Sequence, residues 1–178
     1  VSHDLRNPLN VAEGRLELAK ADCDSEHLEP IDRSLDRMDA LIDDLLTLAR
    51  QGEAIDETEQ VDLAALSRRC WDNVATVDAS LAAEAERTIE ADRSRLQQLL
   101  ENLFRNAVEH GGEDVTITVG DLPDGFSVAD DGPGIPEDKR EQVFESGYTT
   151  ESDGTGFGLA IVAEVVDAHG WEIDVCES

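Results

Sequence analysis

Lysine is almost absent from this sequence, in which Lys20 and Lys139 are the only two. Nearly all of the positive charge is therefore arginine. Only 14 basic residues accompany 42 acidic ones, which gives a formal net charge of −28 at pH 7. Proteins bind nucleic acid largely by neutralising its phosphates with Lys and Arg. This charge balance therefore predicts no nucleic acid partner.

The scarcity of lysine and the excess of acid also bear on the salt in which the protein works. Apolar residues make up 40% of the 178 residues, enough for an ordinary core. At about 1 M salt the Debye length falls to roughly 3 Å, so that like charges repel only their near neighbours. We expect a protein from a salt-loving, halophilic cytoplasm. An acidic protein from a mesophile is the alternative.

Cysteines and long apolar runs are also few. Cys23, Cys70 and Cys176 are far apart and lack metal-ligand spacing, which predicts a reduced, cytoplasmic setting and no zinc site. No apolar run approaches the roughly 20 residues that span a bilayer, and there is no signal-peptide pattern. Because Val1 already lies in a helix-like segment, we expect an excised fragment. Any membrane contact would be made through a missing N-terminal region.

Residues 1–51 predict a helical hairpin. Apolar residues recur at alternating steps of four and three from Leu5 to Ala19 and again from Ile31 to Leu45, as in a coiled-coil seam. Further leucines widen the second stripe, so the hairpin has more apolar surface than it can cover alone. We expect a homodimer in which two hairpins form a four-helix bundle. The alternative is a hairpin packed on its own downstream domain.

A second domain is predicted at 61–178, after an acidic linker at 52–60 that lacks periodicity. Its strongest helix covers about residues 93–110. The stretches VTITVG and FSVAD flank a PDG turn and predict a β-hairpin, and WEIDVC alternates like a strand. Helices interleaved with largely antiparallel strands indicate a two-layer α/β sandwich.

Polar residues follow one edge of the 93–110 helix. Asn102, Asn106 and then Glu109 or His110 recur at helical spacing beside the apolar stripe. Neutral carboxamides can offer oxygen to Mg2+ without adding charge. A pair of capping or solvated asparagines is the alternative, because asparagine is common near helix ends.

Two glycine-rich segments follow. In DDGPGIP, Asp130 can accept a hydrogen bond from an exocyclic amine, while Gly132 and Gly134 let the backbone approach a flat ligand. An ordinary β-turn is the alternative. In GTGFGLA, bare amides lead into an apolar helix, whose N-terminus favours an anion. The spacing matches neither the dinucleotide fingerprint nor a P-loop.

In this order, the motifs resemble those of the sensor histidine kinases over essentially the whole chain. HDLRNPL is similar to the phosphoacceptor box, NLFRNA to the N box, DDGPG to the first glycine box, VFE to the F box and GTGFGL to the second glycine box. The resemblance implies a HisKA hairpin followed by a GHKL-type ATP-binding domain. It also implies ATP and Mg2+ as cofactors and a response-regulator receiver domain as partner.

The phosphoacceptor box indicates a role for His3, near the start of the chain. If Leu5 and Leu9 lie in the seam, His3 points to solvent, where a phosphoryl group could reach it. Asp4 beside it can orient the ring and take its proton. By the family's pattern, Asn7 would align a water for dephosphorylation of the partner.

The resemblance also implies a nucleotide site. Asp130 would read adenine, and Asn102 and Asn106 would hold Mg2+ and phosphates. The other expected nucleotide contacts are His110, Gly132, Gly134, Lys139, Gly154, Thr155, Gly156, Gly158 and Leu159. The family often has a Lys or Arg one turn after the second asparagine. Here Glu109 and His110 stand there, so the cation that contacts phosphate is either missing or supplied by His110, Lys139 or Arg140.

The expected function is autophosphorylation on His3 and transfer of the phosphoryl group to an aspartate of the response regulator, with phosphatase activity as a further possibility. One alternative is an ATPase of the same fold, of the topoisomerase, mismatch-repair or chaperone kind. Asn102, which stands where such ATPases have a water-activating glutamate, and the HDLRNPL hairpin argue against it. The other is a signalling scaffold that has lost transfer, which the Glu109 departure leaves open.

Overall fold

The computed structural model describes residues 2–23, 25, 27–48, 55, 57–74, 78–112, 114–149 and 155–176. For helical residues 2–6, 33, 36–37, 39–40, 43–44 and 46–48 it describes the backbone only. The chain divides into two compact units, a helical hairpin and an α/β unit. No helix within the described ranges is long and apolar enough to cross a membrane.

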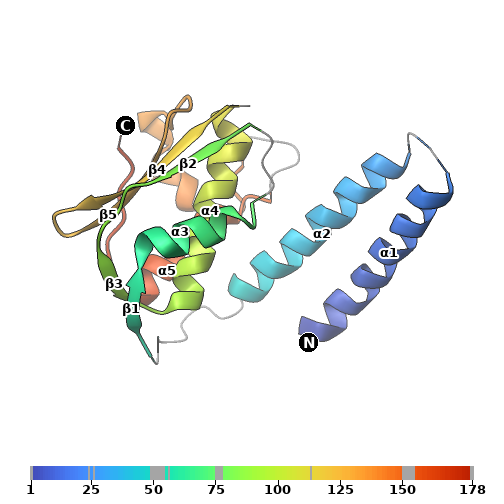
Figure 1. Ribbon diagram of the computed structural model, residues 1–178, viewed down its shortest axis with the longest axis horizontal. Helices are drawn as coiled ribbons and strands as arrows, with labels where there is room; N and C mark the ends of the chain where they lie inside the picture. The colour runs from blue at the N-terminus through green and yellow to red at the C-terminus, as the bar shows by residue number, and fades with distance from the viewer. Residues whose placement is uncertain are drawn as a thin grey trace. The chain divides into compact units, whose positions relative to one another are not determined.

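The hairpin consists of α1 (Ser2–Asp22) and α2 (Leu28–Leu48), which Figure 1 shows side by side. Leu9 and Leu16 of α1 are buried against Leu35 of α2, as the predicted seam requires. Near the turn, Lys20 Nζ lies 2.5 Å from an Asp32 oxygen and 3.6 Å from a Glu29 oxygen. These ion pairs join α1 to α2 at the closed end of the hairpin.

Part of the predicted seam does not pack within the hairpin. Ile31, Met38 and Leu45 of α2 are 47%, 46% and 54% exposed, and Val11 and Leu18 of α1 are exposed as well. The three α2 residues are seven positions apart, so they share one helix face, which α1 covers only in part. The hairpin thus leaves an apolar stripe uncovered.

The α/β unit contains two sheets. A two-stranded antiparallel sheet pairs β1 (Glu59–Asp62) with β3 (Thr88–Ala91). A three-stranded sheet has the order β2-β4-β5, with β2 parallel and β5 antiparallel to β4. Its strands are β2 (Ser80–Ala83), β4 (Thr116–Leu122) and β5 (Gly125–Asp130). Residues 59 and 60, assigned to the linker from sequence, are therefore the first half of β1.

Three helices lie together on one side of the three-stranded sheet (Figure 1). They are α3 (Leu63–Trp71), α4 (Arg93–Gly111) and α5 (Gly158–Ala168), and two short 3-10 helices precede α5: η1 (Glu137–Lys139) and η2 (Gln142–Phe144). Asp62 caps α3 by accepting from the Ala65 amide, and Asp92 caps α4 by accepting from the Ser94 and Arg95 amides. Such caps satisfy amides that the first turn of a helix leaves without partners.

The core lies between the helices and one face of the sheet. Ile117 and Val119 of β4 are fully buried, as are Leu100 and Phe104 of α4 and Ile161 of α5. Because side chains alternate along a strand, Thr116 and Thr118 face the other way. This arrangement confirms the two-layer sandwich expected from sequence.

The segment WEIDVC is not a strand in the structure, contrary to the sequence-based expectation. Trp171 at its start stacks on His169 and meets Phe126 edge to face. Further on, the Asp174 carboxylate accepts from the Val175 amide at 2.8 Å. A local side-chain bond of this kind uses an amide that a strand would offer to a neighbour.

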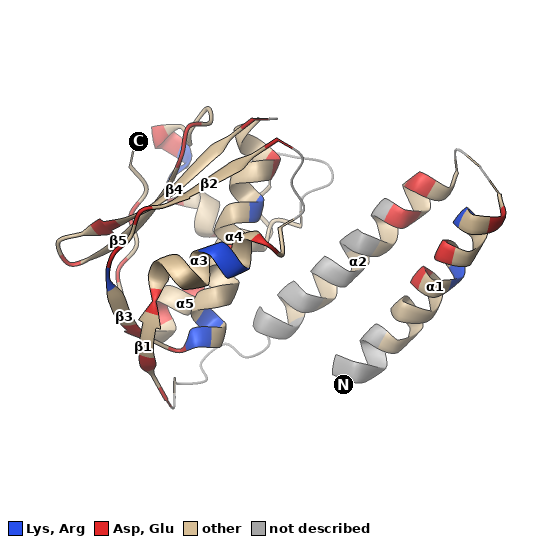
Figure 2. Cartoon of the chain, in the orientation of Figure 1, with Lys and Arg blue, Asp and Glu red and all other residues tan. Residues whose placement is uncertain are grey.

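Acidic residues outnumber basic ones in the described parts of both units, as Figure 2 shows by the many red and few blue segments. His169 makes hydrogen bonds within the protein through both ring nitrogens. Its Nδ1 donates to the Val165 carbonyl oxygen at 2.7 Å, and its Nε2 accepts from the Asp92 amide at 3.0 Å. This imidazole links the end of α5 to the start of α4.

Candidate functional site

Asn102 and Asn106 of α4 meet the first residue of α5. A Cβ placed on Gly158 would lie 3.4 Å from Asn102 Oδ1 and 3.5 Å from Asn106 Oδ1. Asn102 is only 6% exposed, and its Nδ2 donates to the Gln98 carbonyl at 2.9 Å. That bond directs the Asn102 oxygen toward Gly158. The two asparagines therefore form a polar edge rather than a helix cap.

The start of α5 differs from the starts of α3 and α4. Its N-cap residue, Phe157, provides no side-chain hydrogen bond, and the first bond within the helix runs from the Ile161 amide to the Phe157 carbonyl at 2.9 Å. The amides of Gly158, Leu159 and Ala160 are thus not used within the helix. An uncapped N-terminus with amides of this kind favours an anion.

The other end of α4 meets the first glycine-rich segment. A Cβ on Gly132 would lie 2.7 Å from the Gly111 Cα and 2.7 Å from Asp130 Oδ1, so only glycine fits there. The Gly132 amide donates to Asp130 Oδ1 at 3.0 Å. Asp130 is paired with Ile117 in the β4–β5 register and therefore belongs to the helix-covered face.

The two groups of polar atoms mark the ends of a strip along α4. Asn102 and Gly111 are nine residues apart, which at about 1.5 Å per residue places them roughly 13 Å apart along the helix. Asp130 lies at the C-terminal end of this strip, and the asparagines with the α5 amides lie at the other. The strip suits a ligand that carries an amine at one end and phosphates at the other.

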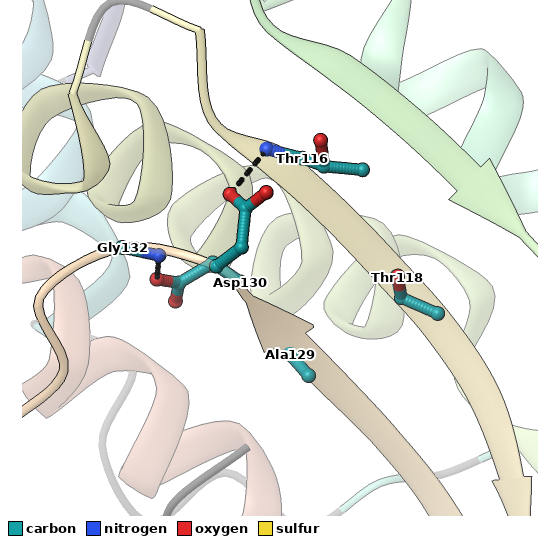
Figure 3. Close-up of a pocket in the computed structure, with 6 residues that line it drawn as sticks. Thr116, Thr118, Ala129, Asp130 and Gly132 are labelled. Atoms are coloured by element: carbon teal, nitrogen blue, oxygen red, sulfur yellow. Dashed lines mark hydrogen bonds between the residues drawn. The ribbon is translucent and has the colours of Figure 1, made fainter.

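A hollow of about 520 Å³ lies on the opposite face of the sheet (Figure 3). The residues that line it are Thr116, Thr118, Ala129, Asp130, Gly132 and Asp131. The Asp131 carboxylate accepts from the Thr116 amide at 2.7 Å. Residues at successive positions of a strand point to opposite faces. Asp130 and Gly132 therefore lie where this hollow meets the C-terminal end of α4, and the Asp131 carboxylate supports the start of β4.

Two family models together match most of this chain. One family model, the His Kinase A (phospho-acceptor) domain, matches residues 1–54, and another, the histidine kinase-, DNA gyrase B- and HSP90-like ATPase, matches residues 91–178. The solved catalytic domain of the histidine kinase ThkA is 32% identical over 68% of this chain and 89% of that chain, with a TM-score of 0.58. The chain belongs to the histidine kinase family.

Longer histidine kinases match nearly all of this chain. The sensor histidine kinase ZraS of Klebsiella oxytoca is 34% identical over 98% of this chain and 41% of its own length. A full-length structure of ShkA in complex with AMPPNP is 31% identical over 98% of this chain and 42% of that one, with a TM-score of 0.68. This histidine kinase chain thus spans about two fifths of the length of such relatives, and its second unit has the GHKL fold.

The donor atoms of Asn102 and Asn106 fit Mg2+. Both carboxamide oxygens approach the same point beside Gly158, and oxygen is the donor that Mg2+ prefers. No cluster of three or more His, Cys, Asp or Glu that could hold a metal occurs among the residues described. Mg2+ usually binds through few protein groups together with substrate phosphates and water. The two asparagines therefore fit a metal that arrives with a nucleotide.

Further nucleotide contacts were predicted at the end of α4 and in the loop after Gly132. His110 is exposed on the last turn of α4, one turn after Asn106, and Gly134 has a left-handed φ of +69°. Lys139 ends η1 and is half-buried, and no described contact joins it to either asparagine. The Arg140 Nε donates to the Ile135 carbonyl within the same loop.

Thr155, Gly156 and Leu159 are half-buried around the start of α5, and Gly154 lies outside the described residues. At the phosphoacceptor box, His3 and Asp4 are in the first turns of α1, with side chains outside the described set. Asn7 is exposed on α1.

Two glycines of the site region were missed from sequence. The Gly111 Cα lies 2.7 Å from the Cβ position of Gly132. The Gly147 amide donates to the Gly156 carbonyl at 2.9 Å. The sequence signals that glycines are present, but not which backbone each one meets.

Burial raises the pKa values of two side chains, Cys70 and Glu164. Burial, with a smaller effect of Glu101, raises the pKa of the Cys70 thiol to about 12, so this cysteine is not a nucleophile at neutral pH. Burial also raises the pKa of Glu164, and the nearby Arg95 offsets part of that rise. Glu164 Oε2 is buried with no hydrogen-bond partner among the described residues.

Proposed function

We propose that this chain is the catalytic core of a protein histidine kinase that phosphorylates itself on His3 and passes the phosphoryl group to an aspartate of a response-regulator receiver domain. The observation that carries the proposal is the strip on α4. It has Asn102, Asn106 and the uncapped start of α5 at one end and Asp130 at the other. Membership of the histidine kinase family supports the same activity.

In this proposal the nucleotide is ATP. Asp130 accepts from the exocyclic amine of adenine, because one of its oxygens already takes the Gly132 amide and a carboxylate has further lone pairs. The amides of Gly158 and Leu159 receive phosphate oxygens, as helix N-termini do. Mg2+ bound with ATP would neutralise phosphate charge, and Asn102 and Asn106 are the residues that would hold it.

The transfer step uses the phosphoacceptor box. An imidazole nitrogen of His3 forms a bond to the γ-phosphorus, and the bond from that phosphorus to the β–γ bridging oxygen breaks, which releases ADP. Asp4 orients the ring and accepts the proton that it loses. Positioning and neutralisation of charge are the main requirements of phosphoryl transfer, so no covalent intermediate at the ATP site is needed.

The same box supports a reverse activity. Asn7 is exposed one helical turn after His3, where its carboxamide could align a water against the phosphorylated partner. Dephosphorylation of the response regulator is therefore part of the proposal.

A homodimer through the hairpin completes the proposed assembly. The stripe of Ile31, Met38 and Leu45 is about half exposed, and a second hairpin would bury it in a four-helix bundle. We propose that residues 1–51 form this phosphotransfer and dimerisation domain, and that the ATP-binding domain begins with β1.

The net charge of −28 supports salt adaptation as a further part of the proposal. Two such chains can associate closely only if their like charges are screened. The proposed setting is a cytoplasm rich in salt.

The deciding experiment is incubation with radiolabelled ATP and Mg2+, followed by acid treatment of the labelled protein. We expect label that is lost in acid, since phosphohistidine is acid-labile. His3→Gln should abolish it, whereas His27→Gln, at an exposed histidine in the hairpin turn, should leave it unchanged. ATP hydrolysis without protein label would indicate an ATPase of another class. Absence of both label and hydrolysis would indicate a scaffold.

A further inference from the structure

Two glycines that are nine positions apart touch through their backbones. Gly147 follows η2 and Gly156 precedes α5, and the Gly147 amide donates to the Gly156 carbonyl at 2.9 Å. A Cβ on Gly156 would lie 2.6 Å from the Gly147 carbonyl carbon and 2.9 Å from its Cα. Real Cβ atoms do not approach backbone this closely, so the contact requires glycine at position 156.

Both residues also have backbone conformations that favour glycine. Gly147 has a φ of +86° and Gly156 a φ of +71°, in the left-handed region. The two positions differ, however, in the free space around them, because a Cβ on Gly147 would meet nothing within 4 Å. An alanine at 147 would add only backbone strain, whereas one at 156 would add strain and a clash.

The contact lies between two parts of the unit that pack on each other. On one side, Val143 in η2 is buried, and turns bonded from Glu145 N to Gln142 O and from Tyr148 N to Glu145 O lead to Gly147. On the other side, Gly156 stands two residues before Gly158, the residue that faces the two asparagines. The contact therefore ties the η2 segment to the start of α5.

We infer that the Gly147–Gly156 contact positions the uncapped start of α5 against Asn102 and Asn106, which makes both glycines positioning residues for the phosphates of the nucleotide. Phe157 gives α5 no side-chain cap, so the path of the chain before it decides where the Gly158 and Leu159 amides point. Asp130 lies at the other end of α4, so the adenine end of the site does not depend on this contact. The inference rests on the proposed function.

The test measures binding of ATP with Mg2+, and separately of adenosine, by competition against a fluorescent ATP analogue. Backbone strain of 1–3 kcal/mol corresponds to about 5-fold to 150-fold in an equilibrium constant. Gly156→Ala should therefore weaken ATP about tenfold or more, while adenosine affinity stays within about twofold. Gly147→Ala should weaken ATP less, and Gly147→Asn should restore part of the loss, because asparagine tolerates left-handed backbone better than alanine.

Gly170→Ala is the matched control, since Gly170 has a φ of +69°, open space around it and a place at the far end of α5. It should leave ATP affinity unchanged. If Gly156→Ala does not fold, the two Gly147 variants decide the question. Equal loss of ATP and adenosine, or ATP affinity equal to that of the wild type in a folded variant, would overturn the inference. Wild-type protein that binds no ATP would instead overturn the proposed function, and the inference with it.

Discussion

Gly158→Ala should weaken nucleotide binding and leave the stability of the protein unchanged or slightly higher. The new methyl group would lie 3.4 Å from Asn102 Oδ1 and 3.5 Å from Asn106 Oδ1, which are ordinary contact distances. The folded protein therefore accommodates it without a shift. The methyl group would, however, occupy the space beside both carboxamide oxygens that a phosphate or its metal needs.

The expected magnitudes follow from these contacts. A hydrogen bond to a charged group contributes about 1.5–3 kcal/mol, so the loss of one such contact weakens ATP binding roughly 10-fold to 150-fold. Alanine is also the better helix former, by up to about 1 kcal/mol in a helix interior and less at its first residue. The melting temperature should therefore stay the same or rise slightly.

Calorimetric titration with ATP and Mg2+ and a thermal melt of the same sample test this prediction. Gly14→Ala is the control, because Gly14 lies within α1 with nothing within 4 Å of its Cβ position, and it should leave ATP affinity unchanged. An unaltered ATP affinity in a folded Gly158→Ala protein would refute the reasoning that phosphates bind between α5 and the asparagines.

Three other predictions use different parts of the molecule. Asp130→Asn should weaken ATP binding by about 1.5–3 kcal/mol in calorimetry, whereas Asp131→Asn, on the outer face, should not; equal effects would remove Asp130 from the site. Glu164→Gln should raise the melting temperature at pH 7, because burial raises the pKa of this carboxyl above its ordinary 4.5 and its ionisation costs stability. That gain should vanish as the pH falls below 4.5, and a gain independent of pH would contradict the assignment. Finally, dimer fraction in sedimentation and melting temperature should both rise from about 0.05 to about 3 M KCl, and flat or falling curves would reject salt adaptation.

The sequence allowed the helical parts of the fold to be predicted well. The hydrophobic period of the first 51 residues identifies both helices of the hairpin, and Leu9, Leu16 and Leu35 pack as that period requires. The helix carrying Asn102 was placed within a residue of its ends, and the hairpin around the PDG turn has the predicted strands. These features depend on local period and turn chemistry, which a single sequence contains.

Features that depend on contacts between distant segments were not predictable. WEIDVC alternates like a strand, yet Trp171 stacks on His169 and Asp174 bonds to the next amide instead. The close approach of Gly111 to Gly132 depends on how α4 crosses the sheet. For the candidate site, the order of the motifs identified the residue types, and the structure added which oxygen faces which backbone.

The β4–β5 turn affects the candidate site although it contains none of the site residues. It fixes the register of β5, and the register decides which of Asp130 and Asp131 faces the helices. Leu122 pairs with Gly125, so only Pro123 and Asp124 separate the strands and set which carboxylate faces the helices. A slip of β5 by one residue would exchange the two faces. The sequence DDGPG would stay intact, but its first acid would no longer share a sheet face with Ile117. A change at this turn that shifts the register would thus disable the adenine end of the site without altering any residue in it.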